Sequence, residues 1–342
     1  MASASEVSTA PAQIAVLGAG SWGTALAIQL ARADRETVLW GRDAAHLAQL
    51  QAQRRNLRYL PDAPFPDALR IEPDLARALQ SSRDVLIAVP SHAFRSTLQA
   101  AAAHLAPNAR VAWATKGFEL ATGLLPHEVA KQVLGEGVPI AVVSGPTFAR
   151  EVGAGLPTAM TVASTDATFA SDLAQRLSGL SFRAYTSNDI VGVEVGGAVK
   201  NVLAIGAGIS DGLGFGANTR IALITRGLVE MTRLGVALGA CKETFMGLAG
   251  LGDLVLTCTD NQSRNRRFGL GLASGENVDA IQRSIGQVVE GVPAARAVRE
   301  VAQRVGVEMP ICEQIYRMIY EGVAPQDAVK ELMSRALKPE NA

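Results

Sequence analysis

The sequence predicts an α/β protein in which a doubly wound, mostly parallel sheet domain is followed by an all-α C-terminal domain. Three observations support this fold class. In the first half, short apolar runs alternate with polar or glycine-rich loops and helical stretches, as in repeated βαβ units. A glycine-rich turn follows the first of these runs. From residue 190 onward the sequence has long helical patterns and no strand pattern.

The glycine-rich turn, residues 18–23, reads G-A-G-S-W-G and lies between an apolar run and an Ala- and Leu-rich helical stretch. In a Rossmann-type domain Gly18 permits the tight turn, Gly20 lets the backbone approach a pyrophosphate, and Gly23 lets the helix lie close to the sheet. The helix N-terminus then offers free N–H groups to the phosphates. Glycine is common in this chain (33 of 342 residues), so the spacing of the three glycines alone is weak evidence. The inference rests on the predicted strand before the turn and the predicted helix after it. We predict that a dinucleotide binds at this turn.

The remaining strands of the predicted sheet follow in order along the first half. We expect a loop with no long regular element at residues 56–71, which contain three prolines. The first domain is expected to span residues 13–187 and a helical substrate domain residues 188–336, after a disordered leader at residues 1–12. The apolar runs predicted to be further strands of the same sheet are residues 37–40, 84–90, 109–114, 140–143, 158–164 and 182–185.

Composition excludes several classes of protein. Lys plus Arg (32) balance Asp plus Glu (32), so we expect no nucleic-acid partner. The longest apolar run, at residues 191–209, is interrupted by Glu194 and Lys200, so we expect no membrane span. The three cysteines are far apart and form no metal-binding pattern with histidine, which favours a cytoplasmic protein without a metal.

The end of the second predicted strand bears on coenzyme choice. An acid there usually holds the ribose hydroxyls of NAD, whereas an arginine nearby accommodates the extra phosphate of NADP. The first charged residue after this strand is Arg42, and Asp43 follows it. We therefore favour NADP as cofactor, with NAD left open. The alternative for Arg42 is a solvated turn residue.

Ligands of a doubly wound sheet bind at the carboxyl ends of its strands. Pro90, Lys116 and Gly145 all follow predicted strands directly and so lie at that edge. Lys116 has the most informative chemistry, because a lysine beside a nicotinamide can polarise a carbonyl or stabilise an alkoxide. The alternative for Lys116 is a surface lysine in a loop.

Residues 190–209 have a helical pattern despite containing five glycines, each of which costs a helix about 1 kcal/mol relative to alanine. Such a helix requires support from packing, so we predict a buried central helix. Lys200 lies within it, and its side chain leans back over Gly196 and Gly197. We expect the two glycines to leave a groove beneath the ammonium for a small substrate. A desolvated lysine has a lowered pKa and suits acid–base catalysis near neutral pH.

Residues 247–269 place polar groups on a glycine-rich backbone. Ser263 or a neighbouring residue is expected to cap a helix that begins near Arg264, and Ser263, Arg264 and Asn265 would form an anion site at its N-terminus. Arg266 and Arg267 are expected to be solvated. Asp253 could orient Lys200 or contact a substrate hydroxyl, with a turn-stabilising role as the alternative. Thr257 is a second hydroxyl of this kind, and residues 286–291 form a glycine-bounded loop before another helix.

Seven ordered motifs show that the chain resembles the NAD(P)-dependent glycerol-3-phosphate dehydrogenases of the bacterial biosynthetic type. They are G-A-G-S-W-G-T-A, V-P-S-H, W-A-T-K-G, S-G-P-T-F-A, G-G-A-V-K-N-V-L-A-I-G, G-L-A-G-L-G-D-L-V-L-T-C and S-R-N-R-R-F-G, and they extend over nearly the whole chain. The resemblance implies reversible reduction of dihydroxyacetone phosphate to sn-glycerol 3-phosphate, a precursor for phospholipid synthesis.

The resemblance also implies roles for individual residues, all of which match the pattern of the family. Lys200 corresponds to the proton-transferring lysine, and Lys116 to a second active-site lysine that contacts both substrate and cofactor. The other implied substrate contacts are Gly145, Thr147, Asn201, Asp253, Thr257, Ser263, Arg264 and Asn265, with Asp253 also in the catalytic group. The implied cofactor contacts besides the three glycines of the turn are Ser21, Trp22, Arg42, Lys116, Ala149, Arg264, Val288 and Glu290.

Two other functions are retained as alternatives. A β-hydroxyacid dehydrogenase also combines a sheet domain, a helical domain and a helix lysine, and its carboxylate substrate could use the same anion site. A dinucleotide-sensing protein without catalysis is the second alternative. A lactate-type mechanism is disfavoured, because all four histidines lie in the predicted nucleotide domain. The partner expected is the small-molecule substrate, and assembly as a homodimer is left open.

Overall fold

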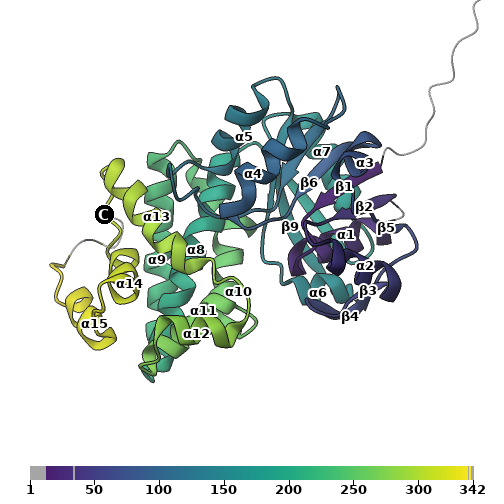
Figure 1. The fold of residues 1–342 in the computed structure, drawn as a ribbon. Helices are drawn as coiled ribbons and strands as arrows, with labels where there is room; N and C mark the ends of the chain where they lie inside the picture. Colours follow the sequence, from purple (N-terminus) through teal and green to yellow (C-terminus); the bar gives the residue numbers. More distant parts are fainter. Residues whose placement is uncertain (1–12, 34, 338, 340–342) are drawn as a thin grey trace, which may run out of the picture.

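The computed structural model describes residues 13–33, 35–337 and 339, and the expected disordered leader lies outside these residues. Figure 1 shows a body built on a sheet beside a body built from helices. All neighbouring strands of the sheet run parallel except β8 and β9, which are antiparallel. The eight strands lie in the order β10 (Phe182–Ser187), β9 (Thr158–Ala163), β8 (Ile140–Ser144), β7 (Arg110–Trp113), β6 (Ser82–Ile87), β1 (Gln13–Leu17), β2 (Thr37–Trp40) and β5 (Leu69–Ile71).

Helices cover both faces of the sheet, which confirms the doubly wound α/β fold. In β1, Ile14 and Val16 face one apolar cluster while Ala15 and Leu17 face the other, so the strand is buried on both sides. The first cluster includes residues of α1 (Ser21–Arg32), α2 (Ala44–Gln53), α6 (Ala149–Ala154) and α7 (Ala167–Leu177). The second includes residues of α3 (Leu75–Gln80), α4 (Ser91–Ala102) and α5 (Pro126–Leu134).

The segment expected to be a loop, residues 56–71, contains short strands that the sequence reading missed. β3 (Arg55–Asn56) pairs with β4 (Leu60–Pro64) as a hairpin, and β5 joins the edge of the main sheet beside β2. Prolines, which lack the N–H group needed to continue a ladder, keep β4 short and confine such segments to edges. The hairpin lies beside the cleft described below.

The helical body is organised around α8 (Ile190–Gly212), which is buried along nearly its whole length, as predicted. Within the described residues, α8 is long and apolar enough to cross a membrane, but 94% of its most apolar window is buried inside the protein, as in a core helix. The sequence of residues 293–336 predicts helices with breaks at Pro310 and near Gly322, and the structure has a break at each position. The other elements are α9 (Ala217–Ala237), η1 (Lys242–Met246), η2 (Leu248–Gly252), α10 (Asp253–Thr259), α11 (Arg264–Ala273), α12 (Val278–Ile285), α13 (Gly291–Arg304), α14 (Pro310–Tyr320) and α15 (Pro325–Met333).

Helices α8 and α11 meet backbone to backbone. A Cβ atom on Gly208 would lie 2.0 Å from the carbonyl oxygen of Arg266, and one on Gly269 would lie 2.1 Å from that of Ile205. Both distances are far below van der Waals contact, so no larger residue fits at either position without displacing a helix. The two glycines therefore set the separation of α8 and α11.

The two bodies share their apolar cores. Phe118 and Leu125, from the segment between β7 and α5, pack in the core of the helical body. Conversely, Ile190 and Val193 of α8, in the helical body, pack in an apolar cluster of the sheet body. Burial of these side chains stabilises the relative placement of the two bodies, since separating them would expose each group to water.

Candidate active site

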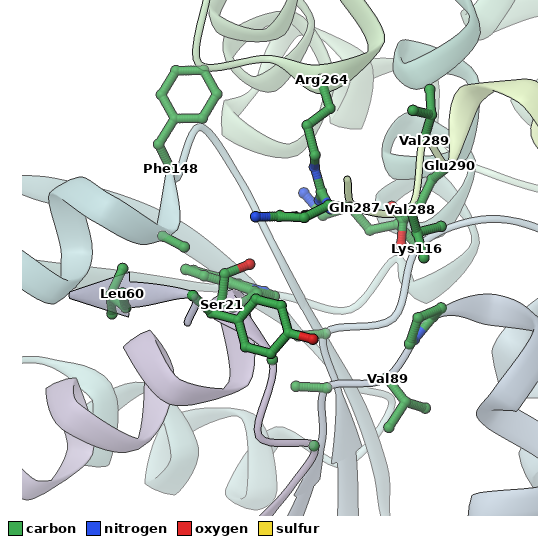
Figure 2. A pocket seen from close by; sticks show the side chains of 18 of the residues that line it. Ser21, Leu60, Val89, Lys116, Phe148, Arg264, Gln287, Val288, Val289 and Glu290 are labelled. Atoms are coloured by element: carbon green, nitrogen blue, oxygen red, sulfur yellow. Dashed lines mark hydrogen bonds between the residues drawn. The ribbon is translucent and has the colours of Figure 1, made fainter. Parts of the chain in front are cut away.

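A cleft of about 1390 Å³ lies between the carboxyl ends of the central strands and the helical body. This exceeds the roughly 300–1,000 Å³ of ordinary small-ligand pockets, as a site for a dinucleotide together with a substrate would. Figure 2 shows Ser21 and Leu60 on one side of the cleft, with Arg264 and the segment from Gln287 to Glu290 on the other. The cleft brings together most of the predicted site residues.

The glycine turn has the conformation that its sequence predicts. Gly18 has a φ of +124°, and a Cβ atom there would lie 2.5 Å from the carbonyl oxygen of Ala88. A Cβ atom on Gly23 would lie 1.9 Å from the carbonyl oxygen of Gly18, whereas one on Gly20 would meet nothing within 4 Å. Gly20 thus leaves open space at the N-terminus of α1, where no side chain caps the helix. This cradle fits a dinucleotide pyrophosphate.

The end of β2 presents basic groups to the cleft. The side chain of Asp43 caps α2 by accepting a hydrogen bond from the backbone N–H of His46 at 3.0 Å. Arg42 is exposed and lines the cleft, as do His46 and Arg58. The Arg58 guanidinium lies 5.0 Å from the ring centre of Tyr59, in the β3–β4 hairpin. The hairpin residues were not predicted to line the cleft, because no sequence motif links them to the glycine turn.

Two lysines from different bodies share one buried carboxylate. Lys116 Nζ donates to Asp253 Oδ2 at 2.7 Å, and Lys200 Nζ donates to Asp253 Oδ1 at 2.5 Å. Thr257 Oγ1 accepts a further hydrogen bond from Lys200 Nζ at 3.0 Å. Lys116 follows β7, Lys200 lies on α8, and the other two residues lie on α10. The cluster therefore spans the contact between the sheet body and the helical body.

The electrostatics of this cluster favour proton transfer. Burial lowers the pKa of Lys200 to about 8, and the neighbouring charge of Lys116 adds to this effect while Asp253 opposes it. Burial opposes ionisation of Asp253, but the charges of Lys116 and Lys200 outweigh it and lower the pKa of that carboxyl. Lys200 can therefore gain and lose a proton near neutral pH, while Asp253 stays ionised.

The glycines beneath Lys200 do not form the expected substrate groove. A Cβ atom on Gly196 would lie 2.4 Å from the carbonyl oxygen of Ala249, and one on Gly197 would lie 3.3 Å from Cγ of Lys116. The backbone of η2 and the stem of Lys116 fill the space that the sequence reading assigned to substrate. Gly197 instead leaves room for Lys116 to reach the carboxylate that it shares with Lys200, and Gly196 leaves room for the backbone of η2.

The first turn of α11 forms the opposite wall of the cleft. Ser263 caps the helix, as predicted, by accepting a hydrogen bond from the backbone N–H of Arg266 at 3.2 Å. Arg264 extends into the cleft, where its Nη1 lies 3.3 Å from Oε1 of Gln287 (Figure 2). Asn265 Nδ2 donates to Asn201 Oδ1 at 2.9 Å, which joins this turn to α8. A guanidinium and helix N–H groups together suit an anion.

Arg266 differs from the solvated residue that was expected. Its side chain is only 10% exposed, and it forms an ion pair with Asp211 at the end of α8. A buried guanidinium needs such a partner, so Arg266 fastens α11 to α8 and does not face the cleft. Arg267 is exposed, as expected.

The predicted site residues differ in whether they line the cleft. Gly23 and Gly145 do not line the cleft, although Gly145 has a φ of +155° and supports the turn before Thr147. The cleft also has many lining residues that the sequence did not identify as binding residues, among them Tyr59, Leu60, Val89, Phe148, Gln287 and Val289. The predicted residues that do line it are Gly18, Gly20, Ser21, Trp22, Arg42, Lys116, Thr147, Ala149, Lys200, Asn201, Asp253, Thr257, Ser263, Arg264, Asn265, Val288 and Glu290.

Family models match both parts of the chain. The model described as NAD-dependent glycerol-3-phosphate dehydrogenase N-terminus matches residues 13–170, and the model of the C-terminus matches residues 189–330. The chain belongs to the NAD-dependent glycerol-3-phosphate dehydrogenase family. The motifs identified in the sequence thus reflect membership of this family, and the alternatives of a β-hydroxyacid dehydrogenase and of a non-catalytic sensor are not favoured.

Curated members of the glycerol-3-phosphate dehydrogenase family resemble the chain over nearly its full length. The glycerol-3-phosphate dehydrogenase [NAD(P)+] of Cronobacter sakazakii is 59% identical, and the match covers 98% of this chain and 99% of that one. The protein of the same name from Yersinia pestis is 60% identical with the same coverage. A crystal structure of glycerol-3-phosphate dehydrogenase from Coxiella burnetii has a TM-score of 0.91 and 50% identity, and covers 94% of this chain and 99% of that chain.

Proposed function

We propose that the chain catalyses the reversible reduction of dihydroxyacetone phosphate to sn-glycerol 3-phosphate with NAD(P)H, which supplies the backbone for phospholipid synthesis. The observation that carries the proposal is the Lys116–Asp253–Lys200 cluster, which lies in the same cleft as the glycine turn and the first turn of α11. Oxidation of NADPH on addition of dihydroxyacetone phosphate tests it. NADP reduction with 3-hydroxyisobutyrate but not with glycerol 3-phosphate would instead support the β-hydroxyacid alternative.

The nicotinamide cofactor supplies the hydride and would be held along the sheet side of the cleft. Gly18, Gly20 and Ser21 at the N-terminus of α1 are suited to its pyrophosphate. The indole Nε1 of Trp22 is buried without a hydrogen-bond partner among the described residues, as expected of a group that serves a ligand. Val288 and Glu290 would complete the site from the helical body. We propose that the reaction needs no metal. Among the described residues, no cluster of three or more His, Cys, Asp and Glu side chains could hold a metal ion.

The substrate phosphate would bind at the first turn of α11. Arg264 supplies a guanidinium, Asn265 an amide, and the helix N-terminus free N–H groups. Because these groups lie on one wall and the lysines on another, the phosphate would orient the ketone towards Lys116 and Lys200. Fixing the reacting atoms in this way removes much of the entropic barrier to reaction.

Both lysines would act at the carbonyl oxygen of the substrate, and Lys200 would also transfer the proton. Both ammonium groups would stabilise the negative charge that develops on that oxygen as it becomes an alkoxide. Lys200, with its pKa of about 8, delivers a proton to the alkoxide and removes it in the reverse direction. Asp253 holds both ammonium groups in place and stays ionised throughout.

Activity is expected to depend on pH with opposite slopes in the two directions. Reduction needs Lys200 protonated, so kcat/KM for dihydroxyacetone phosphate should fall as pH rises through about 8. Oxidation needs the neutral amine, so kcat/KM for glycerol 3-phosphate should rise through the same range. The apparent pKa belongs to the coupled lysine–carboxylate cluster. Initial rates between pH 6 and pH 10 (about two units on each side) check this, and parallel slopes in the two directions would contradict it.

We further propose a preference for NADPH over NADH. Asp43 is occupied in capping α2, whereas Arg42, His46 and Arg58 line the same end of the cleft and could hold a 2′-phosphate. Arg42→Ala is expected to reduce the ratio of kcat/KM for NADPH to that for NADH by about tenfold, through loss of a charge-assisted contact. Kinetics with both coenzymes measure this, with Arg183→Ala on the exposed strand β10 as control. Equal losses with both coenzymes would contradict a role in phosphate recognition.

The remaining assignments are also proposals. Residues 13–187 would form the dinucleotide-binding domain and residues 188–336 the substrate domain, a division supported by the end of β10 at Ser187 and the start of α8 at Ile190. Three unpaired cysteines among the described residues suit a cytoplasmic enzyme. A homodimer is proposed as the assembly, to be tested by light scattering of the purified protein.

A further inference from the structure

A buried carboxylate outside the cleft joins the elements that carry the two lysines. Glu194 lies on α8, the helix of Lys200, and its side chain is only 1% exposed. Its Oε1 accepts hydrogen bonds from Trp113 Nε1 at 2.9 Å and from the backbone N–H of His127 at 3.0 Å. Its Oε2 lies 2.6 Å from His127 Nδ1.

The partners of Glu194 belong to the sheet body. Trp113 is the last residue of β7, and Lys116 follows it by three residues. His127 lies in the first turn of α5, which begins where the segment after Lys116 ends. One carboxylate on α8 therefore fixes both ends of the segment that contains Lys116.

The geometry of the lysine cluster depends on this attachment. Lys200 and Asp253 both lie in the helical body, whereas Lys116 reaches Asp253 from the sheet body. The 2.7 Å distance from Lys116 to Asp253 is therefore maintained only while the end of β7 keeps its position against the helical body. A displacement of about 1 Å in a reacting group can cost on the order of a hundredfold in rate. Arg304 of α13 donates to the carbonyl oxygens of Thr122 and Gly123, and so anchors the later part of the same segment.

We propose that Glu194 is a positioning residue for the reaction: through Trp113 and His127 it holds Lys116 in register with Asp253 and Lys200. The inference rests on the proposed roles of the two lysines. Glu194 does not line the cleft, so it acts through these residues and not on the substrate. A carboxylate meets the geometry because it can accept all three hydrogen bonds, whereas an apolar side chain would leave the indole and backbone donors unpaired.

Two substitutions at Glu194 distinguish the effect of its hydrogen bonds from the effect of its negative charge. In Glu194→Gln the amide oxygen still accepts from Trp113 and from the backbone of His127, and the NH₂ group can donate to a neutral His127 ring. We expect this variant to keep kcat within about threefold of wild type, since the hydrogen-bond geometry survives. Glu194→Ala removes all three contacts that the carboxylate makes with Trp113 and His127. We expect kcat to fall by about thirtyfold or more while the Kd for NADPH stays within about twofold.

Glu230 provides the matched control. Its carboxylate is also buried, lies on α9, and accepts from the backbone N–H groups of Ile311 and Cys312 at 2.7 Å and 3.1 Å. Glu230→Ala is expected to lower the melting temperature as Glu194→Ala does, but to leave kcat within about twofold, because neither lysine depends on α14. A kcat lowered in Glu194→Ala but not in Glu230→Ala thus identifies positioning, whereas a kcat lowered equally in both variants would trace the effect to lost packing and overturn the positioning role.

The outcomes distinguish this inference from the function on which it rests. Wild-type kcat in folded Glu194→Ala, or equal losses in the Gln and Ala variants, would overturn the positioning role while leaving the lysine mechanism intact. If Glu194→Ala does not fold, Trp113→Phe decides, since it removes the indole N–H donor and keeps a smaller aromatic ring at the same buried position. A kcat lowered by about threefold at unchanged KM supports the proposal, and an unchanged kcat overturns it. Full activity in Lys200→Ala would instead refute the proposed mechanism itself.

Discussion

Lys200→Ala is expected to lower kcat for reduction of dihydroxyacetone phosphate by about 10³-fold, the range typical of removing a general acid. The loss combines the missing proton donor with one of two ammonium groups that stabilise the alkoxide. NADPH should bind as in the wild type, because Lys200 lies on α8 in the helical body, whereas the glycine turn that begins at Gly18 belongs to the sheet body. Steady-state kinetics and NADPH fluorescence titration measure the two quantities.

Two further variants sharpen this test. Lys200→Arg keeps the positive charge but cannot release its proton near neutral pH, so it is expected to be about as impaired as the alanine variant. Lys330→Ala, an exposed lysine on α15, is the control and should have wild-type kinetics. An arginine variant with near wild-type kcat would show that charge alone is needed and that Lys200 does not transfer the proton.

Arg264→Ala is expected to raise the KM for dihydroxyacetone phosphate by about 30- to 150-fold, which corresponds to losing about 2–3 kcal/mol of charge-assisted hydrogen bonding. The physical reason is that Arg264 supplies the guanidinium at the first turn of α11, where the phosphate is proposed to bind. The change in kcat should be much smaller, since Arg264 is not part of the lysine–carboxylate cluster.

The substrate itself provides the control for phosphate capture. Unphosphorylated dihydroxyacetone lacks the group that Arg264 is proposed to bind, so its low kcat/KM should be almost the same in wild type and variant. Arg283→Ala on α12 removes an exposed arginine that does not line the cleft, and its KM should remain unchanged. Equal losses for both substrates would show that Arg264 contributes to the cleft in some way other than binding phosphate.

Much of the fold could be predicted because local patterns were strong. The strand–turn–helix around Gly18, the buried helix that carries Lys200 and the cap at Ser263 each follow from a few adjacent residues, and the structure confirms these elements. The strand β5 was missed because it is three residues long and follows several prolines. Its place at the sheet edge depends on pairing with β2, which no local pattern encodes.

The relations within the site were harder to predict, because they join residues far apart in the chain. The sequence suggested that Asp253 could orient Lys200, but not that Lys116 would share the same carboxylate. Gly197 was interpreted as space for substrate, since nothing local shows that the stem of Lys116 fills it. Arg266 was expected in solvent because its partner, Asp211, lies on another helix.

The contact between Gly208 and Gly269 has a consequence for the length of substrate that the cleft can accommodate. Because the backbones of α8 and α11 touch there, no side chain acts as an adjustable spacer between the two helices. The separation of the helix that carries Lys200 from the helix whose first turn lines the cleft is therefore set by the main chain. With the phosphate at the first turn of α11 and the carbonyl at Lys200, as proposed, the fixed separation of the two helices limits how many bonds can lie between these two groups of a substrate.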